Sequence, residues 1–151
     1  MGPAQRETAM TVASILKNKG REIFTVTADE PVTTAIAVLC AKRIGAVVVL
    51  DDKGSIAGIF SERDVIHAMN THGKAVFDKR VGDLMTRNVV TCTPAEPIAG
   101  IMGMMTAQRF RHVPVVEEGR MIGVISIGDV VKSRIAEAQA EVDALRQYIA
   151  L

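Results

Sequence analysis

The sequence predicts a mixed α/β (α+β) fold made of two similar β-α-β-β-α units. Three observations support this: residues repeat at a fixed offset, apolar positions follow helical spacing, and short aliphatic runs are joined by glycine-containing turns. The first part of each copy matches at an offset of 66, as in Glu30-Pro31 and Glu96-Pro97. After a one-residue shortening the offset is 65, which aligns Gly58 with Gly123 and Asp64 with Asp129. Recurrent glycine and proline indicate equivalent backbone geometry.

Each unit is expected to open with a short strand and an amphipathic helix. The strand covers residues 24–26 in the first copy and 89–92 in the second. Asp29 is a candidate N-cap of the first helix, and Pro31 suits its first turn. The apolar positions of both helices share one spacing, which predicts one buried face: Val32, Ala35, Ile36, Leu39 and Cys40, then Ile98, Ile101, Met102 and Met105. Cys40 and the methionines are therefore expected to fill the core.

A hairpin and a second helix complete each unit. Aliphatic runs at 46–50 and 113–116 read as buried strands, and each is followed through a turn by a second strand, at 56–60 and 121–125. Helices are then expected to start at Ser61 and Ser126. This order predicts small sheets covered by helices.

The chain divides by pattern into five segments. These are residues 1–11, an N-terminal tail; 12–72, the first repeat; 73–80, a linker; 81–136, the second repeat; and 137–151, a C-terminal amphipathic helix. Gly2-Pro3 could be a cloning remnant before a native start at Met10. The final helix has apolar residues at Ile135, Val142, Leu145 and Ile149, so it could be a dimer contact, a partner-binding helix or a solvated tail.

Composition excludes several classes of protein. Among 151 residues, 18 basic residues balance 17 acidic ones and aromatic residues make up 3%, which argues against nucleic-acid binding. The longest aliphatic run, 46–50, is too short to span a membrane, and no apolar signal core is visible, so a cytoplasmic protein is expected. Cys40 and Cys92 form neither a disulfide framework nor a zinc motif, and a metal site at His67 and His72 is disfavoured.

The segment that ends each hairpin is the best candidate for chemistry. This segment covers residues 58–64 in the first copy and 123–129 in the second. Each has a serine at the expected helix start and an aspartate three residues later. Free N–H groups at a helix N-terminus suit phosphate, and a nearby carboxylate can accept hydrogen bonds from a ribose diol. The same Ser-x-x-Asp pattern is also a capping box that needs no ligand, and the pattern alone leaves both readings open.

Residues 12–136 resemble a tandem pair of CBS domains, often called a Bateman module. The paired β-α-β-β-α order and the Ser-x-x-Asp endings fit, as do the runs Arg111-His112-Val113-Pro114-Val115 and Asp83-Leu84-Met85-Thr86. The resemblance implies a stand-alone two-CBS protein. It also implies repeats packed through their small sheets with pseudo-two-fold symmetry and two nucleotide clefts.

The resemblance assigns residues from both copies to each cleft. In the first, Ser61 would face phosphate and Asp64 ribose, opposite Met85, Val90, Arg111 and His112. In the second, Ser126 would face phosphate and Asp129 ribose, opposite Lys19, Phe24, Ile44, Gly45 and Ala46. Arg63 could pair with an anion, because a positive charge is otherwise unfavourable in a helix first turn. Gly128 would leave room for close approach of a ligand.

The function implied is a regulatory adenine-nucleotide sensor that binds AMP, ADP, ATP or NAD(H), without catalytic activity. A homodimer and a separate effector partner are expected, and no nucleic acid or membrane. The alternatives are a ligand-free interaction scaffold and another adenosyl ligand such as S-adenosylmethionine. An enzyme is disfavoured, since no Ser-His-Asp order, Cys-His pairing or glycine-rich phosphate loop is present. The preferred nucleotide and the role of Mg²⁺ stay open.

Overall fold

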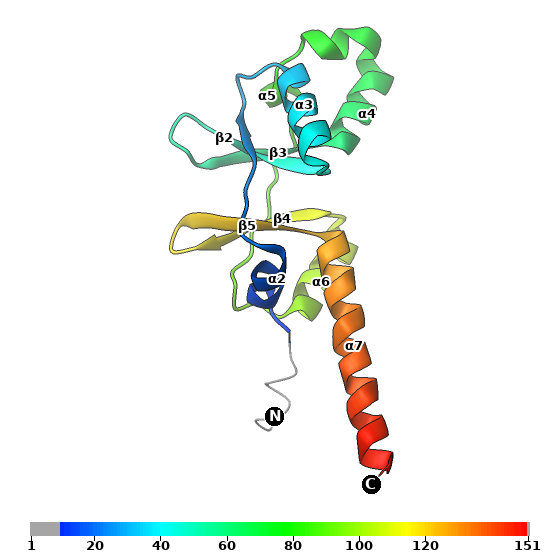
Figure 1. Ribbon diagram of the computed structural model, residues 1–151. Helices are drawn as coiled ribbons and strands as arrows, with labels where there is room; N and C mark the ends of the chain where they lie inside the picture. The colour runs from blue at the N-terminus through cyan, green and yellow to red at the C-terminus, as the bar shows by residue number, and fades with distance from the viewer. Residues whose placement is uncertain (1–9, 151) are drawn as a thin grey trace. The chain divides into compact units, whose positions relative to one another are not determined.

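The computed structural model describes residues 10–150, which form two compact units (Figure 1). Unit 1 combines residues 10–23 with residues 90–150, and unit 2 comprises residues 24–89. The units therefore do not follow the sequence repeats, because the first helix within residues 10–150 belongs with the hairpin of the second copy. The predicted tail residues 1–9 and the last residue, 151, lie outside the described part of the chain.

Unit 2 contains a three-stranded sheet in the order β1-β2-β3. Strand β1 (Thr25–Thr27) pairs in parallel with β2 (Ala46–Leu50), which pairs in antiparallel with β3 (Ile56–Ser61). Its helices are α3 (Val32–Lys42), α4 (Glu62–His72), the 3-10 helix η1 (Gly73–Asp78) and the short α5 (Val81–Leu84). The predicted β-α-β-β-α order of the first copy is confirmed, and α3, α4 and α5 lie on one face of the sheet (Figure 1).

The buried face of α3 is narrower than its sequence pattern indicates. Val32, Ala35 and Leu39 are buried and Ile36 is half-buried, but Cys40 is exposed. At 100° per residue, Cys40 lies about 80° around the helix from Val32, beyond the stripe that meets the sheet. The prediction that Cys40 belongs to the core is wrong for this reason.

The start of α3 also differs from the prediction. Pro31 is its N-cap, and the equivalent Pro97 is the N-cap of α6. Asp29 does not cap the helix; the turn before it is closed by Glu30, whose carboxylate accepts a hydrogen bond of 2.9 Å from the Thr27 amide. The helix therefore begins two residues later than predicted.

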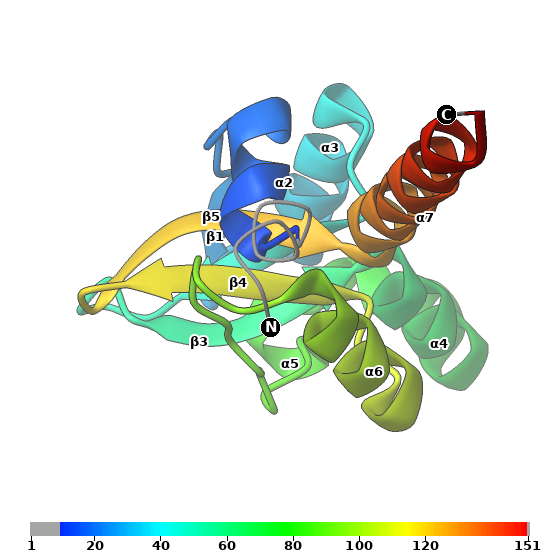
Figure 2. The same ribbon diagram turned by 90° about the horizontal axis from the view of Figure 1, so that it is seen from below.

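Unit 1 is built on a hairpin of β4 (His112–Glu117) and β5 (Arg120–Ser126). Helices α2 (Val12–Lys19), α6 (Ile98–Gln108) and α7 (Ile127–Ala150) lie on one face of this hairpin (Figures 1 and 2). The long final helix was predicted, whereas α2 was not. Its apolar residues Val12, Ile15 and Leu16 are too few for a clear helical period, yet all three are buried in the core.

The strand predicted at 89–92 is reduced to one bridge, between Cys92 and Val115. The Cys92 amide donates to the Pro114 carbonyl at 3.0 Å, and the Val116 amide donates to the Cys92 carbonyl at 2.8 Å. The next parallel bond upstream would require an N–H on Pro114, which proline lacks. In unit 2 the residue at the same register position, Val48, has this N–H, and β1 forms.

The core of unit 1 joins α2, α6, β4, β5 and α7. Met105 is buried, and Met102 and Met104 pack against the core, which confirms the methionines as core filler. Cys92 is buried, and burial, followed by the charge of Glu96, raises the pKa of its thiol to about 12. No helix within residues 10–150 is long and apolar enough to cross a membrane.

Candidate functional site

The Ser-x-x-Asp motif of unit 2 lies where β3 passes into α4. Ser61 is the N-cap, and the Asp64 amide donates to its Oγ at 3.3 Å. In return, Asp64 Oδ2 accepts the Ser61 amide at 2.8 Å and the Ser61 hydroxyl at 3.0 Å. The capping-box interpretation is therefore confirmed. The box also holds the aspartate in one orientation, half-buried, at the strand–helix junction.

The second oxygen of Asp64 is held by the segment after α5. Thr86 Oγ1 donates to Asp64 Oδ1 at 3.1 Å. The Thr86 backbone pairs with Ile59 through two hydrogen bonds of 2.8 and 2.9 Å. This approach is possible because residue 58 is glycine: a Cβ there would lie 2.7 Å from the Thr86 carbonyl oxygen and 2.8 Å from Met85 Sδ.

The motif of unit 1 repeats this box at the junction of β5 and α7. The Asp129 amide donates to Ser126 Oγ at 3.2 Å, and Asp129 Oδ2 accepts the Ser126 amide at 2.8 Å. The difference is the neighbour from α2. Lys19 Nζ lies 2.7 Å from Asp129 Oδ2 and also donates to the Val124 carbonyl at 2.9 Å. A hydroxyl thus faces one aspartate and an ammonium group faces the other.

The pKa of Asp129 reflects this surrounding charge. Burial acts to raise it, but the hydrogen bond from Lys19, the Ser126 amide and the attraction of the Lys19 charge outweigh burial. They hold the pKa of the carboxyl below its ordinary value of 3.8. The side chains of Lys19 and Asp129 keep 41% and 25% of their surface exposed, so both groups remain accessible to a solute.

A glycine also permits close packing beside this second box. A Cβ on Gly123 would lie 2.5 Å from Leu16 Cδ2, in α2. Leu16 therefore packs against Gly123 in the same way as Met85 packs against Gly58. Each box has a segment from the other sequence copy packed behind its strand, and that segment supplies Lys19 in unit 1 and Thr86 in unit 2.

The predicted strand-entry residues adjoin the serines of their own units. His112 pairs with Ser126 across the hairpin, and the Arg111 carbonyl accepts the Ile127 amide at 2.8 Å. In the same way Ala46 pairs with Ser61, and the Gly45 carbonyl accepts the Glu62 amide at 3.0 Å. The predicted grouping of Arg111 and His112 with Asp64, and of Gly45 and Ala46 with Asp129, joins residues of both units and stays a prediction.

The remaining predicted residues are placed as follows. Phe24 is half-buried with Lys42 Nζ 5.0 Å from its ring centre, and Ile44 packs against the core of unit 2. Val90 is half-buried in unit 1, and Arg63 is exposed in the first turn of α4. Gly128 is exposed in the first turn of α7, where a Cβ would meet only Ser126 Oγ, at 3.6 Å. Within residues 10–150, no group of three His, Cys, Asp or Glu side chains is placed to hold a metal ion.

Comparison with known proteins identifies the family. The CBS domain model matches residues 12–71 and 81–136. The chain belongs to the CBS domain family.

The mitochondrial CBS domain-containing protein CBSX3 of Arabidopsis thaliana is 33% identical over 147 residues, which cover 92% of this chain and 71% of that protein. Two longer curated relatives have 39% and 22% of their length matched. The crystal structure of the CBS-domain protein ATU1752 from Agrobacterium tumefaciens is 47% identical, with a TM-score of 0.80, covering 83% of this chain and 94% of that one. A crystal structure of CBSX2 in complex with AMP is 25% identical, with a TM-score of 0.67, covering 84% and 97%.

Sequence reasoning missed Thr86 as a partner of Asp64 and Leu16 as the residue packed against Gly123. Thr86 lies within the run Asp83-Leu84-Met85-Thr86 that carries the resemblance, so it was visible as part of a motif. Leu16 had no such signal, because it precedes the first matched position of the internal repeat.

Proposed function

We propose that this CBS-domain protein is a non-catalytic regulatory module that binds an adenine nucleotide at its two Ser-x-x-Asp motifs. The observation behind the proposal is that both units hold a half-buried aspartate at the same strand–helix junction. Within residues 10–150, an ion pair is present at Asp129 and none at Asp64, so an ion pair does not account for both carboxylates. Capping alone explains one oxygen of each aspartate. The carboxylates, together with the cations Lys19 and Arg63 nearby, offer partners for the hydroxyl groups and the phosphate of a nucleotide.

In unit 1, the arrangement offers partners for both parts of a nucleotide. The Asp129 carboxylate can accept the two hydroxyl groups of a ribose, as acidic residues do in dinucleotide-binding folds. Lys19, 2.7 Å away, is a flexible cation that can turn to a phosphate.

In unit 2, the partners of Asp64 are neutral. The carboxylate is held by Ser61 and Thr86, and the exposed cation Arg63 sits in the first turn of α4. We therefore expect ribose recognition at both motifs and stronger phosphate binding at Asp129. The bound AMP of CBSX2 supports an adenine nucleotide as the ligand class. We propose AMP, ADP, ATP or NAD(H), and rank S-adenosylmethionine lower because it brings a cation and no phosphate.

Output from such a module requires a second molecule. No effector domain is visible among the described residues, so we propose that the ligand biases an equilibrium that a partner protein reads. Homodimerisation is part of this proposal.

The test is a thermal-shift panel with AMP, ADP, ATP, NAD⁺, NADH and S-adenosylmethionine on the wild type, Asp64→Asn and Asp129→Asn. Asparagine preserves the shape of the cap but removes the charge. Asp52→Asn, in the exposed turn after β2, is the matched control. A ligand at about a hundred times its Kd stabilises by about 2.7 kcal/mol, which corresponds to about 5–10 °C for a chain of this size.

A rise in Tm with adenine nucleotides that is lost in one of the two motif variants and kept in Asp52→Asn supports the proposal. The variant that loses the rise identifies the motif that binds the nucleotide. No shift with any ligand at millimolar concentration contradicts it. That result would favour the alternative of an interaction scaffold.

A further inference from the structure

The C-terminal half of α7 is exposed along its whole length. Glu137 is the last buried residue of the helix, where its carboxylate accepts the Met10 amide at 2.8 Å, and residues 138–150 are all exposed. Figure 1 shows this half, drawn from orange to red, extending beyond α2 and α6 of the same unit. In water, helices gain most of their stability from packing of an apolar face, so a partner for this half is expected.

Apolar side chains follow α7 at alternating spacings of four and three residues. They are Val131, Ile135, Ala138, Val142, Leu145 and Ile149. This period of 3.5 places them in one narrow stripe, the a and d positions of a heptad repeat. Ile135, Leu145 and Ile149 are 64%, 60% and 79% exposed, so the stripe is open to a partner.

The residue types in the stripe indicate what the partner is. The a positions are Ile135, Val142 and Ile149, all β-branched, and Leu145 stands at a d position. Within parallel coiled coils, β-branched residues at a with leucine at d favour two strands over three or four. A second copy of α7 carries the complementary set by symmetry.

The charges beside the stripe also fit a second copy. Glu141 takes a g position and Arg146 the e position of the following heptad. In a parallel pair, each g residue meets the e residue five positions later on the partner helix, so Glu141 would face the second copy's Arg146 twice per dimer. In an antiparallel pair, g faces g and this match is lost.

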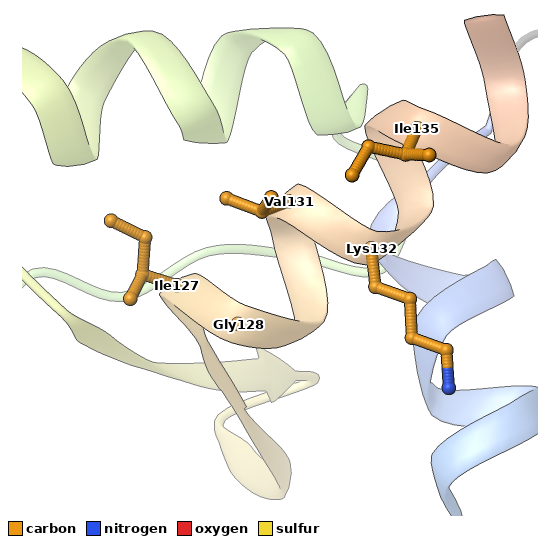
Figure 3. A pocket seen from close by; sticks show the side chains of 5 residues that line it. All are labelled: Ile127, Gly128, Val131, Lys132 and Ile135. Atoms are coloured by element: carbon orange, nitrogen blue, oxygen red, sulfur yellow. The ribbon is translucent and has the colours of Figure 1, made fainter.

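The beginning of the stripe leaves room for partner side chains. A hollow of about 470 Å³ is lined by Ile127, Gly128, Val131, Lys132 and Ile135. Figure 3 shows Ile127, Val131 and Ile135 on the same side of α7, with Lys132 pointing away from them. The hollow and the exposed stripe therefore form one continuous apolar surface.

We propose that α7 pairs in parallel and in register with α7 of a second copy, as a two-stranded coiled coil over residues 131–149. The stretch covers fewer than three heptads and has the small Ala138 at one d position, so the dimer is concentration-dependent. The proposal rests on the homodimerisation included in the proposed function and names its surface. That surface lies apart from the Ser-x-x-Asp motifs, so the dimer does not depend on nucleotide binding.

Sedimentation equilibrium of the full chain tests the surface. Leu145→Asp and Val142→Asp place a charge in the seam, and Gln147→Asp, at the f position of the same exposed stretch, is the matched control. We expect a micromolar-range dimer whose dissociation constant rises about a hundredfold in either seam variant, since two apolar side chains are lost per dimer. A monomer at every concentration, or a dimer that the seam variants leave unchanged, overturns the proposal.

Disulfide trapping tests the orientation. In a Cys40→Ser background, Ala138→Cys and Leu145→Cys should each cross-link to themselves, because in-register parallel helices bring every d position against its own copy. Gln147→Cys should not cross-link. The native Cys92 does not interfere, since its thiol is buried. An antiparallel pair can bring only one position against itself, so cross-linking at one or neither position overturns the parallel arrangement.

Discussion

The two units hold the same carboxylate in different electrostatic surroundings. Asp64 is held by the hydroxyl groups of Ser61 and Thr86, whereas Asp129 forms an ion pair with Lys19 at 2.7 Å. The local motif is duplicated almost unchanged, and the difference comes from the segments packed behind it. Duplication thus preserved the cap, and divergence outside the motif changed the charge that a ligand would meet.

The glycines behind the two boxes offer the largest test of this comparison. Gly58→Ala would press its Cβ against the Thr86 carbonyl oxygen, a backbone atom that cannot turn away, and we expect a loss of about 3 kcal/mol. Gly123→Ala meets the end of the Leu16 side chain, which can shift, and should cost about 1–2 kcal/mol. Urea unfolding gives the cost, and hydrogen exchange by mass spectrometry assigns it to a unit. A larger loss for Gly123→Ala would show that the α2 packing is the stiffer of the two.

Removal of the neighbour of each aspartate should separate the two sites by affinity. We expect Lys19→Met to weaken nucleotide binding at Asp129 about tenfold, because a charged phosphate partner is lost. Thr86→Val should weaken binding at Asp64 only about two- to threefold. Titration calorimetry, with the other motif disabled by its Asp→Asn change, measures each site alone. Equal effects of the two variants would mean that the ion pair does not contribute to phosphate binding.

The ion pair also predicts a pH dependence of stability in unit 1. Because the folded pKa of Asp129 lies below its ordinary value of 3.8, the charged group stabilises the fold above that value. The contribution is lost as pH falls through the lower, folded pKa. We expect Asp129→Asn to cost about 0.5–1 kcal/mol at pH 7, and the difference from wild type to shrink below about pH 4. Urea midpoints from pH 7 to pH 3.5 measure this, and a difference that grows on acidification would contradict it.

The smallest effect is expected at the second helical position of α7. Gly128→Ala introduces a Cβ with only an ordinary contact at 3.6 Å, so it should stabilise the protein by about 0.5–1 kcal/mol through helix propensity. The equivalent Arg63→Ala in unit 2 should change stability by a few tenths of a kcal/mol. If Gly128 serves close approach of a ligand, nucleotide affinity should fall while Tm rises. Unchanged affinity would remove Gly128 from the site.

Much of the fold follows from short-range patterns. The hairpins and helices at 32–42 and 98–108 were predictable because aliphatic strands, glycine turns and helical spacing lie within a few residues of one another. The errors occurred where packing against another segment, and not the local sequence pattern, determines the length of a strand or the exposure of a side chain. Pro114 shortens the strand at 89–92 by lacking an N–H on the neighbouring strand. Cys40 is exposed because it lies outside the stripe of α3 that meets the sheet.

The sequence by itself indicated the repeat, the resemblance to CBS domains and the two Ser-x-x-Asp motifs, because all three are patterns of residue types along the chain. It left open whether each motif caps a helix or binds a ligand. Only the tertiary structure decided what stands beside each aspartate. Lys19 and Asp129 are 110 positions apart, and they meet because α2 packs on the hairpin of the other copy. Such a contact depends on how all the buried faces pack together, which no local spacing encodes.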